Sequence, residues 1–305
     1  MQKLHAILMT GNNRRGYIGG VPKCYVRFGD EKRTNSASRV LDRLNIAKSI
    51  ETITVIGEEY YINNELDCSN ARKPLYLVSQ RENATFADNI LDAYNFLVGR
   101  LKEEHEIGVL SVFGDVPFRM PCTIDLFVHK IDENADLAIH LVKQEAIKRF
   151  YNIYRRPLVP VSEDGKLNWF KPDDMFYIKP TKFSYSDINE LYQKRETSKF
   201  GFAIKTIRLI SRKYPQLKGP LIKAFILRQI YRSLGISLPI FNGSLEKSRL
   251  EQIVKENPPY INAQIIPTDN PDGYFDIDNE ADFRKLDKNL NFVSSELTRF
   301  LLYGN

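Results

Sequence analysis

The chain has 305 residues, about twice the usual domain length of roughly 150, so its length allows one large domain or two smaller ones. Hydrophobic residues make up 43% and charged residues 27% of the chain, which excludes a largely disordered protein, a collagen-like repeat and a small disulfide scaffold. The net charge is +6, and three widely spaced cysteines without a C-x-x-C pair favour a reducing compartment.

Apolar runs are too short for targeting or membrane insertion. The first run covers residues 6–9, whereas the apolar part of a secretory signal needs roughly 7–15 residues. Nowhere do about 18 consecutive apolar residues occur. We therefore expect no signal peptide, no transmembrane segment and a cytoplasmic protein.

Positive charge is concentrated in one part of the sequence. Residues 195–235 contain ten Lys or Arg and one Glu, a net charge of +9, which leaves −3 for the rest of the chain. This distribution argues against a general nucleic-acid binder and for one localised anionic contact. A solvated helix face is the first interpretation of the stretch, and a weak contact with an anionic membrane surface is the alternative.

The first 143 residues alternate β-rich runs with helical patterns. Helical periodicity covers 38–44 and 86–101, and Thr85 is placed to cap the second helix. Strands separated by such helices form parallel βαβ units, so we predict an α/β fold with a mostly parallel, Rossmann-like open sheet covered on both faces. The β-rich runs are 4–10, 52–56, 75–79, 107–113 and 136–143.

After residue 143 the alternation stops. Two β-rich runs, 151–161 and 169–179, flank a turn and predict a β-hairpin or extra edge strands. Residues 187–234 follow a helical pattern, and a last strand is predicted over 261–268. We therefore predict a single domain over 1–305 whose core is 1–143 and 261–290, with 144–260 as a hairpin and helical insertion.

A glycine-rich, basic segment follows the first predicted strand directly. Backbone N–H groups of such a loop can surround phosphate oxygens, and Lys23 adds a point charge. The alternative is a surface turn whose glycines adopt positive φ. The glycines are Gly11, Gly16, Gly19 and Gly20, and the cations before Lys23 are Arg14 and Arg15.

Asp115 follows the fourth predicted strand and Gly114. An acid at this place lies at the carboxyl end of its strand, where a hard cation that bridges phosphates finds oxygen ligands. The alternative is a turn residue before Val116-Pro117. The four histidines have no common catalytic spacing, and we interpret them as structural.

These motifs together resemble the MobA-like nucleotidyltransferases, a group with a glycosyltransferase-A-like fold. The resemblance rests on the loop 10–23, on Gly114 to Pro117, on 81–89 and on 276–283. It covers residues 1–143 and 261–287. This sequence departs from the family pattern in having Asn12-Asn13 after Gly11, and it has no proline in 279–281.

The resemblance implies a Mg²⁺-dependent transfer of a nucleoside monophosphate to a phosphorylated acceptor, with pyrophosphate released. The acceptor class is a sugar phosphate, a polyol phosphate or a cofactor precursor. It implies Lys23, Arg15 and Asp115 as catalytic residues, and Asp115 and Asp278, with Asp276, as Mg²⁺ ligands. The implied nucleotide-binding residues are Thr10, Gly11, Asn12, Gly16, Gly19, Gly20, Asn83, Asn89 and Gly114.

Two further questions concern the acceptor and the class of protein. Four basic residues in or just before the first run of the predicted hairpin (Lys148, Arg149, Arg155 and Arg156) can cover an anionic acceptor, and we assign this role to Lys148 and Arg155. The alternatives to an enzyme of this type are a non-catalytic nucleotide or sugar-phosphate binder and a nucleotide-sugar glycosyltransferase. The glycosyltransferase would carry an Asp-x-Asp motif near mid-chain, but the motif here is at 276–278.

Overall fold

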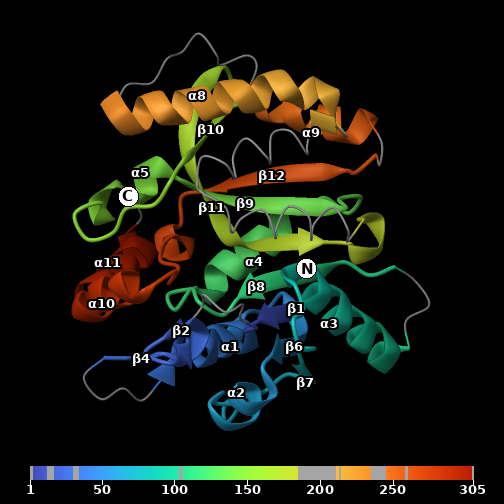
Figure 1. Ribbon diagram of the computed structural model, residues 1–305, viewed down its shortest axis with the longest axis vertical. Coiled ribbons are helices and arrows are strands. Elements are labelled where there is room, and N and C mark those ends of the chain that lie inside the picture. Colours follow the sequence, from blue (N-terminus) through green and yellow to red (C-terminus); the bar gives the residue numbers. More distant parts are fainter. Residues whose placement is uncertain are drawn as a thin grey trace.

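The structure is a computed structural model that describes residues 3–11, 17–29, 34–102, 106–184, 211–212, 214–234, 245–257 and 260–303. Its centre is an eight-stranded, mostly parallel sheet flanked by helices (Figure 1). Seven strands follow the order β12-β9-β11-β8-β1-β6-β7, and β10 pairs with β11 outside this path. The predicted α/β fold class is confirmed.

The parallel half of the sheet comes from the first 113 residues. β1 lies between β6 and β8 and is parallel to both. Five of the six β1 residues are buried, a continuous pattern typical of strands that are covered on both faces. The four strands are β1 (Leu4–Met9), β6 (Ile50–Gly57), β7 (Leu75–Ser79) and β8 (Val109–Phe113).

Helices cover both faces of this half. α1 (Ser36–Ile46) and α4 (Pro121–Lys130) pack on the face that carries Leu8, whereas α3 (Phe86–Leu101) packs on the face that carries Ile7. Successive strand residues point to opposite faces, so β1 contributes to both layers. The three layers hold the strand ends in fixed positions.

The other half of the sheet is mixed. β9 (Leu137–Lys143) and β12 (Ala263–Thr268) are parallel, and β11 (Lys166–Ile178) runs antiparallel between β8 and β9. β10 (Val159–Glu163) forms the predicted hairpin with β11. The hairpin is predicted to lie outside the core, but β11 is a central strand that separates β8 from β9.

The first strand of the hairpin is shorter than predicted. It begins at Val159 rather than at residue 151, because the chain over 148–154 forms tight turns that bury Phe150 and Tyr154. The hairpin turn is formed by Asp164 and Gly165, both with positive φ.

A second apolar core lies beside the sheet, on the left in Figure 1. It packs η6 (Pro271–Tyr274), α10 (Glu280–Lys288) and α11 (Leu290–Tyr303) against Phe150 and other aromatic residues. Phe275 and Ile277, which link η6 to α10, are fully buried there. The link is therefore anchored at two points of its length.

Most of the remaining described elements are peripheral. α8 (Lys218–Leu234) packs on β10 at the top of Figure 1, and most of the predicted helical stretch before it lies outside the described residues. No described helix is long and apolar enough to cross a membrane. The other elements are β2 (Tyr17–Ile18), β3 (Val21–Pro22), η1 (Lys23–Tyr25), β4 (Arg27–Phe28), β5 (Thr34–Asn35), α2 (Glu59–Asn64), α5 (Gln144–Ile147), η2 (Lys148–Phe150), η3 (Pro180–Lys182), η4 (Pro215–Leu217) and α9 (Lys247–Glu256).

Candidate active site

The carboxyl ends of β1 and β8 lie side by side and carry Thr10 and Gly114. The Gly114 N–H donates to the Met9 carbonyl at 2.9 Å, and a Cβ at position 114 would lie 3.0 Å from Cγ2 of Thr10. The Thr10 hydroxyl donates to the Ile56 carbonyl at 3.1 Å and accepts from the Tyr25 hydroxyl at 2.9 Å. Thr10 is thus a buried residue that ties strand ends together, at the kind of position where open α/β sheets bind ligands.

The glycines before Lys23 shape a hairpin. β2 and β3 are joined by Gly19 and Gly20, whose φ angles are +58° and +81°. A two-residue turn with two positive φ angles favours glycine, so the hairpin accounts for both residues without a phosphate contact. The predicted site residues Asn12, Arg15 and Gly16 lie outside the described residues.

Lys23, Asp115 and Asp278 converge at the end of β8. The Lys23 ammonium forms an ion pair with the Asp115 carboxylate and lies 3.7 Å from the Asp278 carboxylate. Burial would lower the pKa of Lys23, but the neighbouring Asp115 and Asp278 raise it, so the ammonium is charged. Two acids that are 163 positions apart in the sequence thus contact one cation.

Backbone contacts bring Asp278 to this position. The Ile277 N–H donates to the Asp115 carbonyl at 3.0 Å, which joins the end of β8 to the link between η6 and α10. Asn279 then caps α10, because its side chain accepts from the Asp282 N–H at 3.0 Å. Asp278 is therefore held between the buried Ile277 and the helix cap Asn279.

Arg156 binds three acids around this link. Its guanidinium lies 3.0 Å from Asp276, 2.7 Å from Asp278 and 3.2 Å from Asp282. The same guanidinium stacks over the Tyr154 ring at 4.6 Å. Asp278 is therefore shared between Arg156 on one side and Lys23 on the other.

The Asp276 carboxylate is paired with two basic side chains, whereas the sequence predicts it as a Mg²⁺ ligand. Its carboxylate contacts Arg156 and lies 3.1 Å from the ammonium of Lys171, which also contacts Asp174 at 2.9 Å. Burial would raise the pKa of Asp276, but Lys171 and Arg156 lower it below its usual value. Among the described residues, no group of three or more Asp, Glu, His or Cys is arranged as a metal site. Asp115 and Asp278 remain the pair that faces one cation position.

A buried ion network lies beneath the site and was not predicted. Arg119 donates to Asp173 through two hydrogen bonds of 2.7 and 2.6 Å, and the His140 ring contacts the same carboxylate at 2.6 Å. Burial would raise the pKa of Asp173, but Arg119 and His140 lower it. Asp272 accepts from the Met120 N–H at 2.7 Å, so the network also anchors η6.

The predicted nucleotide-binding residues Asn89 and Asn83 differ in their exposure to solvent. Asn89 is buried and donates to Gln80 at 3.3 Å, and a Cβ at Gly11 would lie 2.2 Å from Oε1 of Gln80 and 2.8 Å from Nδ2 of Asn89. The Oδ1 atom of Asn89 is buried and has no hydrogen-bond partner within the described ranges. Asn83, in contrast, is exposed in a turn at φ +59°. Gln80, which directly follows β7, was not predicted.

The two residues assigned to the acceptor do not reach the acids. Lys148 forms an exposed ion pair with Glu145 at 2.9 Å, and Arg155 donates to the Tyr151 carbonyl at 3.2 Å. Their neighbour Arg156 is the basic residue that faces the site. Lys171 was also missed, although a lysine in a β-rich run followed by two aspartates is a signal that the sequence contains.

Solved structures of other proteins have a fold similar to that of this chain. No protein-family model and no curated protein match the sequence. A solved structure described as a hypothetical transferase from Thermus thermophilus is 17% identical, covers 92% of this chain and 100% of its own, and has a TM-score of 0.56. CMP:2-keto-3-deoxy-manno-octonic acid synthetase, complexed with CTP, is 10% identical, covers 96% and 100%, and has a TM-score of 0.50.

The chain therefore shares the α/β fold of these two solved structures over nearly its whole length. At such low identities the similarity shows the fold alone. It does not single out the MobA-like branch.

Proposed function

We propose that this protein is a Mg²⁺-dependent nucleotidyltransferase. It transfers a nucleoside monophosphate from a nucleoside triphosphate to a phosphorylated small molecule and releases pyrophosphate. The observation that carries the proposal is the convergence of Lys23, Asp115 and Asp278 at the carboxyl ends of β1 and β8. The synthetase with a similar fold was solved with CTP, which makes CTP the first nucleotide to test.

The two acids fit a Mg²⁺ ion. One oxygen of Asp115 faces Lys23, and the other is buried with no hydrogen-bond partner within the described ranges. Mg²⁺ typically takes one or two carboxylates and completes its shell with water and substrate phosphates, so a third protein acid is not needed. When bound, the ion supplies positive charge next to the phosphates.

The residues of this chain then have distinct roles. An acceptor phosphate oxygen forms a bond to the α-phosphorus, the bond from the α-phosphorus to the bridging oxygen breaks, and pyrophosphate leaves. The attacking oxygen is already anionic, so no general base is required. Lys23 stabilises the charge that develops on the phosphates, and Arg156 orients Asp278. Gln80 and Asn89, beside Gly11, are proposed to contact the base or ribose.

A screen for pyrophosphate release tests this function. The four common nucleoside triphosphates are incubated with Mg²⁺ and a panel of phosphorylated sugars, polyols and cofactor precursors. We expect release with at least one pair of substrates. D115N and D278N should each lower the rate by about 10²-fold or more, because each removes a charge used at the reaction centre. The matched control D269N alters an exposed acid paired with Lys143 and should keep the wild-type rate.

The non-catalytic binder is tested by calorimetric titration of the same triphosphates with Mg²⁺. Binding of a triphosphate without pyrophosphate release from any substrate pair favours a nucleotide binder. If D115N and D278N keep the wild-type rate, the proposed site is wrong.

A further inference from the structure

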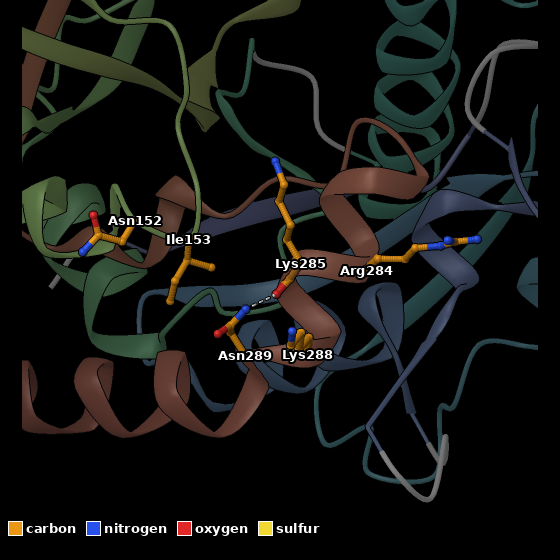
Figure 2. A pocket seen from close by; sticks show the side chains of 6 residues that line it. All are labelled: Asn152, Ile153, Arg284, Lys285, Lys288 and Asn289. Atoms are coloured by element: carbon orange, nitrogen blue, oxygen red, sulfur yellow. Dashed lines mark hydrogen bonds between the residues drawn. The ribbon is translucent and has the colours of Figure 1, made fainter.

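A basic hollow lies beside the candidate site and is not part of it. It has a volume of about 400 Å³, within the range of small-molecule pockets, roughly 300–1,000 Å³. Figure 2 shows Asn152 and Ile153 on one wall and the side chain of Lys285 opposite them. The complete lining is Asn152, Ile153, Arg284, Lys285, Lys288 and Asn289.

A second recess adjoins the hollow and adds another cation. It shares Asn152, Ile153 and Lys285 with the hollow, and Arg155 also lines it. Arg155 and Lys285 come from different segments of the chain, which the fold brings to one opening. Convergence of cations from separate segments is not explained by the helix dipole, which would favour only the lysines in the last turn of α10.

The acids of α10 do not neutralise these lysines. Glu280 pairs with Arg284 at 2.6 Å, and Asp282 pairs with Arg156 at 3.2 Å. Asp287 accepts from the Gly29 N–H at 2.7 Å. Within the described ranges Lys285 and Lys288 have no ion pair, and no acid lines the hollow, so its lining has an excess of positive charge.

The wall formed by residues 151–155 is held firmly. The Tyr154 hydroxyl donates to the Asp276 carbonyl, and the Tyr154 carbonyl accepts from the Tyr274 hydroxyl. These bonds tie the hollow to the link that carries Asp278. The opening is therefore a fixed feature next to the candidate site, and Ile153 gives it one apolar contact.

We propose that this hollow binds a phosphate monoester. Lys285 and Lys288 supply charge that matches a dianion, and Arg155 can bind phosphate oxygens through two N–H groups. Ile153 and the lysine stems then contact the carbon skeleton. The phosphate belongs either to a soluble molecule or to a lipid headgroup. This inference does not depend on the proposed function, because it concerns binding alone.

Calorimetry with glycerol 3-phosphate tests the soluble source. Wild type is compared with K285Q/K288Q and with the matched control K130Q/K255Q, which removes two exposed lysines elsewhere. All titrations use one ionic strength, because salt screens such contacts. We expect saturable binding that weakens about tenfold or more in K285Q/K288Q and stays within about twofold of wild type in the control. Glycerol, which lacks the charge, should not bind.

Co-sedimentation with phosphatidylcholine vesicles containing phosphatidic acid tests the lipid source. Vesicle binding that is lost in K285Q/K288Q and kept in the control pair assigns the site to a headgroup. Binding of glycerol 3-phosphate without vesicle binding assigns it to a soluble ligand. Absence of both in wild type, or equal weakening in the two double variants, overturns the proposal. Binding of glycerol 3-phosphate or of vesicles supports the hollow as a phosphate site even if the pyrophosphate screen finds no transfer.

Discussion

The ammonium of Lys23 forms an ion pair with the carboxylate of Asp115, and the Lys23 side chain is only 20% exposed. The sequence predicts that Lys23 adds a point charge to a phosphate-binding loop, and the structure shows that this lysine is largely buried against an acid. Removing it would leave Asp115 buried without its cation. Lys23 therefore has two effects that can be measured separately, one on stability and one on catalysis.

The first prediction concerns both effects of Lys23. K23M should lower turnover by about 10²-fold or more. It should also destabilise the protein by on the order of 3 kcal/mol at neutral pH, because breaking a buried pair leaves an uncompensated charge. Urea unfolding and single-turnover rates measure the two effects. A variant that loses stability but keeps its rate per folded molecule would make Lys23 purely structural.

The second prediction concerns metal binding without nucleotide. Lys23 already neutralises Asp115 and lies close to Asp278, so it competes with a divalent cation for this pair. K23Q should therefore bind Mn²⁺ about tenfold more tightly than wild type when no nucleotide is present. Electron paramagnetic resonance reports free Mn²⁺ directly. Equal affinities would show that Lys23 and the metal do not share a site.

The third prediction concerns Arg156. R156Q removes the cation shared by Asp276, Asp278 and Asp282, so Asp278 loses its orientation. We expect a fall of about tenfold or more in kcat, because misplacement of a positioning group slows the reaction strongly. R156K should recover only part of it, because a lysine cannot reproduce the planar fork. The control R299Q changes an exposed arginine on α11 and should match wild type.

The fourth prediction concerns the buried network under the site. D173A leaves the fully buried Arg119 without its bidentate partner and should cost about 3–5 kcal/mol in the free energy of unfolding. Substitution of an exposed acid, as in D269A, should change stability by less than about 0.5 kcal/mol. Denaturant unfolding compares the two. Similar small losses in both variants would show that the network does not support the fold.

The fifth prediction concerns the pH dependence of stability. Burial, together with Asp276 and Asp115, raises the pKa of Asp174 to about 7, although Lys171 opposes the shift. A carboxyl whose folded-state pKa lies above its unfolded value of roughly 4 stabilises the fold in acid, and this contribution is lost as pH rises through about 7. Between pH 4 and 7, wild type should therefore lose stability relative to D174N. If the free energy of unfolding changes with pH equally in wild type and D174N, the pKa of Asp174 is not raised.

The main strands of the first 143 residues and the helices α1 and α3 could be predicted because their signals are local, whereas α2 and α4 were not predicted. Continuous apolar runs identified the buried parallel strands, and Thr85 as a predicted cap identified the start of α3, where the structure shows a capping box with Asp88. The place of β11 could not be predicted, because the pairing of distant strands leaves no mark in a single sequence. Its insertion between β8 and β9 is a property of the whole sheet.

In the candidate site, too, some residues could be predicted from local sequence and others depend on contacts between distant parts of the chain. Asp115 and Asp278 could be named from their positions after strands and in motifs. Arg155 and Arg156 could not be told apart, because consecutive residues point in different directions and only the packing of Tyr154 decides which one faces the acids.

A crystal structure of the protein with Mg²⁺ and CTP is the decisive test of the proposed site. We expect one cation about 2.1 Å from oxygens of both Asp115 and Asp278, the triphosphate beside Gly11, and Lys23 turned from Asp115 towards the phosphates. A nucleotide bound elsewhere, or one bound here while Lys23 still occupies the acid pair and no metal lies between the two acids, would contradict it.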